Sequence, residues 1–364
     1  TDLRNAVLDT ELTMIAVGTP FDGKKIDLSQ VQAASTAIGQ AIREKRPYHM
    51  IVVKSTVVPG TTDEIVTPAV ANASGKTPGI DFGVGMNPEF LREGSAVADF
   101  MHPDRIVLGA MDEKGMAMLE KLYQPFPSAD KVKTNNKTAE TIKYTSNALL
   151  ATLISFSNEI GNFCSTIGGI DVTEVMQGVH LDKRLSPIVD GGQRIIPAIT
   201  TYLEAGCGFG GSCFPKDVKA LISHGRNMGQ PMPLLEAVIQ INKEQPYQIL
   251  RLLEKHFSSF HDLKVGVLGL AFKPGTDDMR ESPAIPVIKE LIARKARIKA
   301  FDPAAQTAAQ QLFGNQRIHF CEELETAATG VDAVILLTRW DEFRRLPAIV
   351  EKIKPQPLVI DGRS

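Results

Sequence analysis

The sequence has 364 residues, of which 43% are hydrophobic and 23% charged, and its formal net charge is −2. The length suggests about two or three domains. The balanced charge excludes the basic surface of a nucleic-acid-binding protein, and no apolar run is long enough to span a membrane. No signal peptide is recognisable, and four irregularly spaced cysteines are typical of a reducing cytosol. We therefore expect a cytoplasmic enzyme.

Strands alternate with helices in the first part of the chain. The pattern predicts strands at 12–18, 50–54 and 82–86, and helices at 28–42 and from about 62. This alternation favours a parallel, doubly wound sheet. No glycine-rich turn accompanies the first strand, so we expect this nucleotide-binding domain to be incomplete, with its N-terminal part lacking.

The middle of the chain is predicted to be helical. A long helix is expected at 138–167, with an apolar stripe at Ile142, Leu149, Leu153, Phe156, Ile160 and Phe163. Glu140, Lys143 and Asn147 lie on a second face, which on pattern alone is typical of an exposed helix start. Further helices are expected at 171–178 and 231–256.

A second α/β region closes the chain. Residues 257–262 are typical of a linker, and strands are predicted at 264–270, 297–301, 333–337 and 358–361. The fold class is therefore α/β, with two Rossmann-like doubly wound domains, the first incomplete, joined by a long central helix and a helical middle domain. We place the domains at 1–133, 134–257 and 258–364.

The most informative stretch is Gly206-Cys-Gly-Phe-Gly-Gly-Ser-Cys-Phe-Pro-Lys-Asp217. Its glycines permit positive φ and close approach to a ligand, and Pro215 suits the first turn of a helix. Cys213 is thus expected at a helix N-terminus with Lys216 nearby, and both features favour a thiolate. Asp217 is a candidate acid or base. The pattern indicates covalent catalysis by a thiolate.

Three other interpretations of this stretch are open from local chemistry. Gly206, Gly208 and Gly211 match a dinucleotide-binding turn, although 199–205 is a poor strand and no suitable acidic residue follows. Cys207 and Cys213 could pair or hold a metal, but they have no second pair of cysteines. Cys213 could also be a buried structural thiol.

The segment Gly208–Asp217 resembles the active-site cysteine motif of the UDP-glucose/GDP-mannose dehydrogenase family. Asn87-Pro-Glu-Phe-Leu-Arg-Glu-Gly94 and Ala271-Phe-Lys followed by Asp278-Met-Arg-Glu-Ser282 resemble further motifs of these nucleotide-sugar 6-dehydrogenases. The family oxidises a sugar C6 alcohol to a carboxylate with two NAD⁺. The resemblance covers nearly the whole chain.

The resemblance implies roles for several residues. Glu89 would assist hydrolysis of the covalent intermediate, Thr56 would position the water, and Lys143 and Asn147 would stabilise charge on the C6 oxygen, with Cys213 and Asp217 completing the catalytic set. Glu89 and Glu93, four residues apart, would share a face if this segment formed a helical turn. The implied substrate contacts are Glu89, Phe90, Leu91, Lys143, Asn147, Arg184, Tyr202, Leu203, Gly210, Phe272, Lys273 and Arg363. The implied cofactor contacts are Thr19, Pro20, Ser55, Thr56, Glu93, Lys216 and Arg280.

The expected reaction is the NAD-dependent oxidation of a UDP-sugar, with UDP-glucose favoured, through a thiohemiacetal and a thioester on Cys213. It requires no metal. UDP-N-acetylmannosamine or GDP-mannose dehydrogenation, or an inactive sugar-nucleotide-binding fragment, are the alternatives. Arg194 is a rival for the role of Arg184, which in the family reaches a neighbouring subunit, and the family implies a homodimer or higher oligomer.

Overall fold

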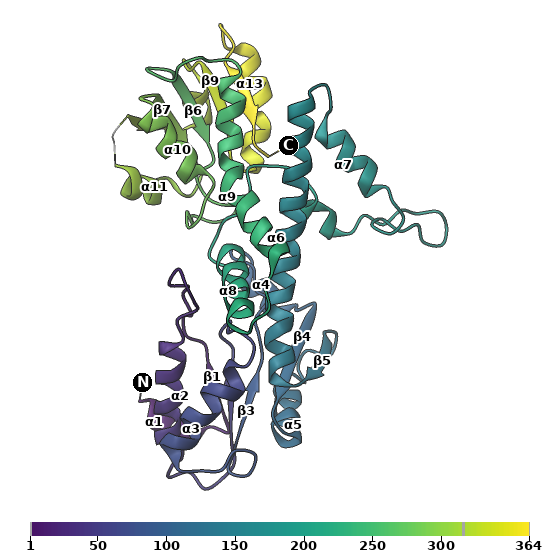
Figure 1. Cartoon of the computed structure of the whole chain (residues 1–364), viewed down its shortest axis with the longest axis vertical. Coiled ribbons are helices and arrows are strands. Elements are labelled where there is room, and N and C mark those ends of the chain that lie inside the picture. Colours follow the sequence, from purple (N-terminus) through teal and green to yellow (C-terminus); the bar gives the residue numbers. More distant parts are fainter. Residues whose placement is uncertain (1, 315–316, 364) are drawn as a thin grey trace. The chain divides into compact units, whose positions relative to one another are not determined.

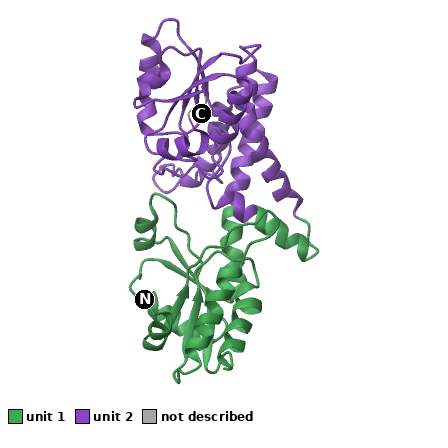
Figure 2. Cartoon of the chain, turned by 90° about the vertical axis from the view of Figure 1, so that its left-hand side faces the viewer, with its two compact units in different colours: residues 1–147, 219–231 green, residues 148–218, 232–364 purple. Residues whose placement is uncertain are grey.

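A computed structural model describes residues 2–314 and 317–363 (Figure 1). The chain divides into two compact units, coloured separately in Figure 2. Unit 1 comprises the residues up to Asn147 together with Lys219–Pro231, and unit 2 comprises Ala148–Val218 together with the chain from Met232 onward. None of the described helices is both long enough and apolar enough to cross a membrane.

Unit 1 contains a sheet whose described strands follow the order β1-β2-β3-β4-β5. Their bounds are β1 Leu12–Ile15, β2 His49–Val53, β3 Phe82–Met86, β4 Arg105–Ala110 and β5 Asp130–Thr134. Strands β1 to β3 are mutually parallel, as predicted, but β4 pairs antiparallel with β3. The three predicted strands therefore have the expected parallel arrangement, whereas β4, which was not predicted, runs antiparallel to β3.

The helices of unit 1 cover this sheet. They are α1 Leu3–Asp9, α2 Ser29–Ile42, α3 Thr67–Ser74, α4 Ala96–Met101 and α5 Glu113–Leu122, with a π-helical turn at Thr62–Val66 before α3. Apolar side chains of α2, α3 and β2 form a core from which water is excluded. The C-terminus of α1 is capped from a distance, since the ammonium of Lys45 donates to the carbonyl oxygens of Val7 at 2.7 Å, Leu8 at 3.0 Å and Thr10.

Unit 2 contains a second, wholly parallel sheet in the order β10-β9-β6-β7-β8. The strands are β6 Lys264–Leu268, β7 Arg297–Phe301, β8 Ile318–Phe320, β9 Ala333–Leu336 and β10 Leu358–Asp361. The accompanying helices are α10 Ala284–Ala293, α11 Gln306–Phe313, α12 Leu324–Ala328 and α13 Leu346–Lys352, with a 3₁₀ turn at Asp341–Arg345. The first strand lies at the centre and the order reverses there, which is the doubly wound arrangement that was predicted.

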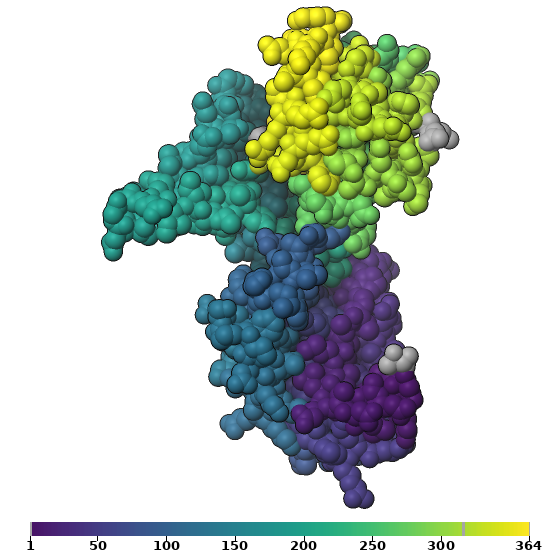
Figure 3. Space-filling model, turned by 180° about the vertical axis from the view of Figure 1, so that it is seen from behind, coloured from purple at the N-terminus to yellow at the C-terminus, as the bar shows by residue number. Residues whose placement is uncertain are grey.

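The helical middle of the chain is also as predicted, with small shifts at the ends. It comprises α6 Asn136–Ile167, α7 Val172–His180, a 3₁₀ turn at Ala198–Tyr202, α8 Phe214–Asn227 and α9 Pro233–Glu254. Helix α6 has 32 residues and is therefore about 48 Å long. In unit 2, α7 and the loop after it project from the rest of the unit (Figures 1 and 3).

Helix α6 buries several polar side chains and leaves part of its apolar stripe exposed. Its polar residues Glu140, Lys143 and Asn147 are 0%, 4% and 8% exposed, so the interpretation as an exposed helix start is wrong. In the apolar stripe, by contrast, Leu149, Phe156 and Phe163 are about half exposed. A buried polar group requires a hydrogen-bond or ion-pair partner. A contiguous exposed apolar surface typically marks a place where another molecule or subunit binds.

Candidate active site

Cys213 lies immediately before the first residue of α8, as predicted. The N–H of Asp217 donates to the carbonyl oxygen of Cys213 at 2.8 Å, so Cys213 closes the first turn of the helix. Its thiol is exposed, and the hydroxyl of Ser212 lies 3.7 Å from the sulfur. The unpaired N–H groups and the dipole of a helix N-terminus favour negative charge on a group in this position.

An ion pair stands one turn along this helix. The ammonium of Lys216 lies 2.7 Å from Oδ1 of Asp217, and the side chain of Asp217 is 2% exposed. The ammonium of Lys216 is therefore ion-paired with Asp217. Both charged groups lie within four residues of the exposed thiol in the sequence. They can therefore exchange protons with a substrate held at that thiol.

The glycines before Cys213 are required by close packing. Gly208 and Gly211 have φ of +97° and +81°. A Cβ on Gly210 would lie 2.3 Å from the carbonyl oxygen of Glu281, and one on Gly211 would lie 2.7 Å from the ring of Phe272. The N–H of Gly211 also donates to the carbonyl oxygen of Arg280 at 2.8 Å. The loop is thus pressed against the segment 272–281.

Three other interpretations of the glycine stretch fail: a dinucleotide-binding turn, a disulfide between Cys207 and Cys213, and a buried structural thiol at Cys213. It follows the 3₁₀ turn at Ala198–Tyr202 rather than a strand, so it is not a dinucleotide-binding turn. Cys207 and Cys213 are both free, and they differ in environment. Cys207 is fully buried, and this burial raises the pKa of its thiol. Cys213 is exposed, so it is not a structural core thiol.

Arg363 connects three parts of unit 2. Its guanidinium donates to the carbonyl oxygens of Leu337 at 2.6 Å, Gly208 at 3.1 Å and Phe272 at 3.4 Å. The ring of Phe272 lies under the ammonium of Lys273 at 5.6 Å. Arg363, Phe272 and the loop with Gly210 are thus brought together, with Lys273 next in sequence to Phe272, and their contacts with a substrate stay predictions.

A residue that the sequence analysis missed organises the same region. Asp302, the residue after β7, is 2% exposed. Its Oδ2 accepts from the N–H groups of Leu270 at 2.7 Å and Ala271 at 3.0 Å and from Nε1 of Trp340 at 3.1 Å. Its Oδ1 accepts from the N–H groups of Ala304 and Ala305 at 2.8 and 2.7 Å. In dinucleotide-binding folds an acid at this position binds ribose, but here it is occupied with protein donors.

The other predicted contacts of unit 2 lie on three further segments. Tyr202 and Leu203 belong to the end of the 3₁₀ turn, and the ring of Tyr202 lies 6.5 Å from that of Phe214. Arg280 forms a forked ion pair with Asp278. Arg184 is likewise paired with Asp182 on the projecting segment, where Arg194 donates to the carbonyl oxygens of Leu181 and Ser186 at 2.8 Å.

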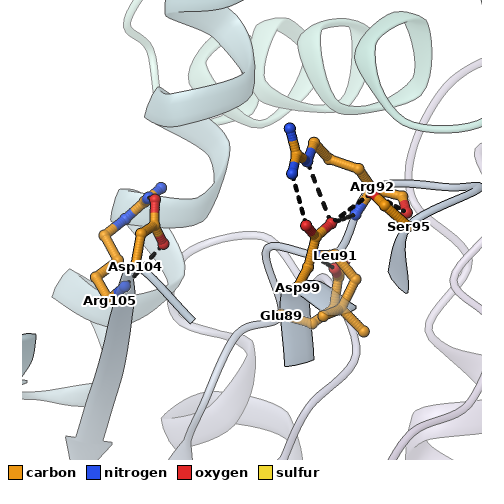
Figure 4. A network of polar contacts seen from close by, with 7 residues as sticks. All are labelled: Glu89, Leu91, Arg92, Ser95, Asp99, Asp104 and Arg105. Carbon is orange, nitrogen blue, oxygen red and sulfur yellow. Dashed lines mark hydrogen bonds and ion pairs between the residues drawn. The ribbon is translucent and has the colours of Figure 1, made fainter. Parts of the chain in front are cut away.

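Unit 1 holds a second group of predicted residues. The ammonium of Lys143, 4% exposed, lies 3.1 Å from Oε1 of Glu89. Oε2 of Glu89 accepts from the N–H of Leu91 at 2.7 Å (Figure 4). The ring of Phe90 lies 5.3 Å from the ammonium of Lys143 and 4.0 Å from the guanidinium of Arg105. Lys143, Glu89, Phe90 and Leu91 therefore form one cluster.

The segment from Asn87 to Arg92 is not helical, so Glu89 and Glu93 do not share a helical face. Pro88 lacks an N–H, and the carboxylate of Glu89 binds a local backbone N–H in place of a helical carbonyl. Figure 4 shows the neighbouring fork between Arg92 and Asp99, which ties this segment to α4. The segment is thus held in an irregular, non-helical conformation beside Lys143.

Four of the seven predicted cofactor residues, Thr19, Pro20, Ser55 and Thr56, lie where the parallel strands β1 and β2 end. Thr19 follows β1, and its hydroxyl donates to the carbonyl oxygen of Thr56 at 2.7 Å. Ser55 follows β2, and its hydroxyl donates to the carbonyl oxygen of Val17 at 2.7 Å. Pro20 is joined to this turn through its carbonyl oxygen, which accepts from Asp27. The carboxyl edge of a doubly wound sheet is the place where nucleotides bind.

Glu140 was singled out only as a polar residue, and the structure shows what it does. One oxygen accepts from the N–H of Gly60 at 2.6 Å, and the other from the N–H and hydroxyl of Thr62 at 2.8 and 2.6 Å. Burial raises the pKa of this carboxyl to about 7. Glu140 thereby anchors the loop that carries Thr56 to the helix that carries Lys143.

Comparison with known proteins supplies the class. The NAD-binding domain model of the UDP-glucose/GDP-mannose dehydrogenase family matches residues 1–127, its central domain matches 137–244, and its UDP-binding domain matches 266–364. The fold and the matched domains define an NAD-dependent oxidoreductase that acts on nucleotide sugars. More particularly, the chain belongs to the UDP-glucose/GDP-mannose dehydrogenase family.

Individual relatives agree. UDP-glucose 6-dehydrogenase AglM of Haloferax volcanii is 39% identical, with 98% of this chain and 80% of the relative covered. UDP-glucose 6-dehydrogenase TuaD of Bacillus subtilis is 40% identical, with 100% and 74% covered. A solved UDP-glucose dehydrogenase from Pyrobaculum islandicum superposes with a TM-score of 0.86 at 41% identity, over 99% of this chain and 78% of that one.

Proposed function

We propose that this chain oxidises UDP-glucose to UDP-glucuronate in two NAD-dependent steps, with Cys213 as the nucleophile. The observation that carries the proposal is the exposed thiol of Cys213 at the N-terminus of α8, one turn from the buried Asp217. The substrate is the one named for relatives that are about 40% identical over nearly the whole chain.

Residues of unit 2 carry the covalent chemistry. The thiolate of Cys213 adds to the C6 aldehyde produced by the first oxidation and forms a thiohemiacetal. Removal of a hydride from C6 of this adduct and of a proton from its hydroxyl leaves a thioester, and water then releases the carboxylate and restores the thiol. Asp217 accepts and returns protons during these steps. Phe272, Lys273 and Arg363 hold the sugar nucleotide, together with the backbone of 202–210.

Residues of unit 1 act on charge and water. Lys143 and Asn147 stabilise negative charge on the C6 oxygen, and Lys143 also accepts the hydroxyl proton. Glu89, ion-paired with Lys143, assists the water that cleaves the thioester, and Thr56 positions that water. Thr19, Pro20, Ser55, Thr56 and Glu93 fit a dinucleotide, since the first four lie at the carboxyl edge of β1 and β2. NAD⁺, when bound, supplies the electron acceptor for each oxidation.

The test is NADH formation by the purified chain with UDP-glucose and NAD⁺. We expect about two NADH per sugar, the stoichiometry of an alcohol-to-carboxylate oxidation. UDP-N-acetylmannosamine and GDP-mannose serve as matched substrates and should react more slowly. Cys213→Ser should form no UDP-glucuronate, and Cys207→Ser, in the core, controls for loss of a thiol elsewhere. Full turnover by Cys213→Ser would refute the mechanism.

We also propose a homodimer formed through the outer face of α6. Leu149, Phe156 and Phe163 recur at seven-residue intervals and are 51%, 48% and 61% exposed, which suits burial against another helix. Light scattering after size exclusion should give twice the mass of the chain, and Phe156→Asp should give a monomer. The three-domain division at 1–133, 134–257 and 258–364 and the cytoplasmic location stay predictions.

A further inference from the structure

Four carboxamide side chains without a predicted role lie beside the glycine loop 206–211. Asn158 and Asn162 are four residues apart on α6, so they share one face of that helix. Asn242 and Gln245 are three residues apart on α9 and likewise share a face. Asn158 and Gln245 are 0% and 5% exposed, and all four residues belong to unit 2. We call these four residues the amide clamp.

The carboxamide of Asn242 binds both backbone groups of Phe209. Its Oδ1 accepts from the N–H of Phe209 at 2.8 Å, and its Nδ2 donates to the carbonyl oxygen of the same residue at 2.9 Å. Two residues of neighbouring strands exchange hydrogen bonds in the same way, and the exchange fixes both the position and the orientation of the backbone. A Cβ on Gly208 would lie 2.7 Å from Oδ1 of Asn242, so the glycine lets the carboxamide approach the loop.

Gly206 is held by carboxamides from two helices. Its N–H donates to Oδ1 of Asn158 at 2.7 Å, and its carbonyl oxygen accepts from Nε2 of Gln245 at 2.7 Å. Asn162 and Gln245 donate to each other at 2.9 and 3.3 Å, so α6 and α9 are joined beside the loop (Figure 1). The backbone of the loop is therefore fixed at two residues by side chains from two long helices.

The arrangement of Asn158 is not optimal for stability. Its Nδ2 is buried and has no hydrogen-bond partner among the residues that the structure describes. A buried donor without a partner lowers the free energy of unfolding, and an apolar side chain of similar size would avoid that cost. The hydrogen bond from Gly206 is therefore what this carboxamide provides, and it provides it at the expense of stability.

Phe209 connects the clamp to the helix that carries the nucleophile. Its side chain is 6% exposed, and its ring lies edge to face with the ring of Phe214, with 6.0 Å between the centroids. Phe214 is the first residue of α8 and directly follows Cys213. Movement of the Phe209 backbone would therefore be passed through two packed rings to the residue next to Cys213.

We propose that the amide clamp positions Cys213 for capture of the C6 aldehyde. In that step the thiolate adds to the carbonyl carbon, and the carbonyl oxygen takes up a proton to give the thiohemiacetal. The four carboxamides are positioning residues, because they act through the backbone of Gly206 and Phe209. The inference rests on the proposed function, since only that function gives Cys213 an aldehyde to capture.

The experiment compares two substitutions of Asn242 with one control. Asn242→Ala removes both hydrogen bonds to Phe209. Asn242→Asp is nearly isosteric and keeps an acceptor for the N–H, but it places a carboxylate oxygen against the carbonyl oxygen of Phe209. Gln240→Ala is the matched control, because it removes an exposed carboxamide from the same helix. If Asn242→Ala does not fold, Asn242→Asp decides the question.

Turnover is measured with UDP-glucose, NAD⁺ and semicarbazide, which captures free aldehyde. Wild type and Gln240→Ala should form about two NADH per sugar consumed, because the thiolate captures the aldehyde before it leaves. Both Asn242 variants should release trapped aldehyde, form fewer NADH per sugar and have a kcat at least about tenfold lower, because the nucleophile is misplaced. Partial unfolding alone would lower the rate and leave the NADH ratio unchanged.

Hydrogen–deuterium exchange separates this inference from the proposed function, because it needs no turnover. The N–H of Phe209 should exchange faster in both Asn242 variants than in wild type and Gln240→Ala, by at least about tenfold in Asn242→Ala. If wild type forms no NADH, the proposed function fails, and the exchange rate then decides whether the clamp holds the loop. Equal exchange of the Phe209 N–H in all four proteins would overturn the inference. So would a wild-type NADH ratio without trapped aldehyde in a variant whose Phe209 N–H exchanges faster.

Discussion

Substitution of Asp302 by Asn should be nearly as damaging as complete removal of the carboxylate. The carboxylate of Asp302 accepts five hydrogen bonds from N–H groups, three at Oδ2 and two at Oδ1. Asparagine has one acceptor oxygen, and its amide nitrogen is itself a donor. Whichever way the amide is oriented, at least two N–H groups lose their acceptor and face another donor, and at least one of them is buried.

The magnitude follows from that count. A buried donor left without a partner costs about 1–3 kcal/mol, so one buried and one partly buried donor together reduce the free energy of unfolding by about 3 kcal/mol. Asparagine is nearly isosteric with aspartate, and no cavity contributes. Because Leu270 and Ala271 lead directly into Phe272 and Lys273, the KM for UDP-glucose should also rise.

The assay is denaturant unfolding followed by tryptophan fluorescence. Trp340 is the single tryptophan of the sequence and donates to Asp302, so its emission reports on this cluster. Asp332→Asn is the matched control, since the Asp332 side chain accepts from the N–H of Lys264 on an exposed part of the same unit, and its cost should stay below about 1 kcal/mol. A cost of less than about 1 kcal/mol for Asp302→Asn would refute the reasoning.

Three further predictions concern pH and packing. Burial raises the pKa of Glu140 from 4.5 to about 7, so its contribution to stability, about 3 kcal/mol, is present below pH 4.5 and lost as the pH rises through 7. Glu140→Gln should flatten this part of the pH dependence of the melting temperature, and parallel curves would contradict it. Burial lowers the pKa of His49 from 6.5 to about 4, so stability should fall as the pH drops through that range, and His49→Gln should remove this loss, as seen in acid-titrated melting curves. Gly211→Ala places a side chain on a residue with a φ of +81° and puts its Cβ 2.7 Å from the ring of Phe272, so we expect kcat/KM to drop at least about tenfold. Gly275→Ala serves as the control, because it introduces only the backbone strain and its Cβ has open space around it.

Local signals predicted local structure well. Pro215 and the preceding glycines indicated a helix start next to Cys213, and α8 begins there. The alternation of apolar strands and helices was enough for the doubly wound sheets. Strands β4 and β5 were not predicted as elements of the sheet, and the antiparallel pairing of β4 depends on contacts that no sequence window contains.

Buried polar residues were the harder problem. The polar residues at the start of α6 have the spacing of an exposed helix face, yet Glu140 is fully buried. The local pattern does not reveal this burial, because the partners of Glu140, Gly60 and Thr62, lie about 80 residues away in the sequence. Asp302 was missed for the same reason, because its donors come from the loops after β6 and β9 as well as from its own loop. For Glu89 and Lys143 only the family resemblance indicated a role in one reaction, and the structure adds that the two side chains form an ion pair.

The contrast among the four cysteines has a practical consequence. Cys164, Cys207 and Cys321 are buried, and Cys213 alone of the four is exposed. A mild alkylating reagent applied to the folded wild-type protein should therefore modify one thiol per chain, and that thiol is the proposed nucleophile. Reagent uptake then counts intact active sites directly in any preparation, and bound sugar nucleotide should slow the labelling. The same exposure makes the enzyme's activity sensitive to oxidants, whereas burial protects the other three thiols from them.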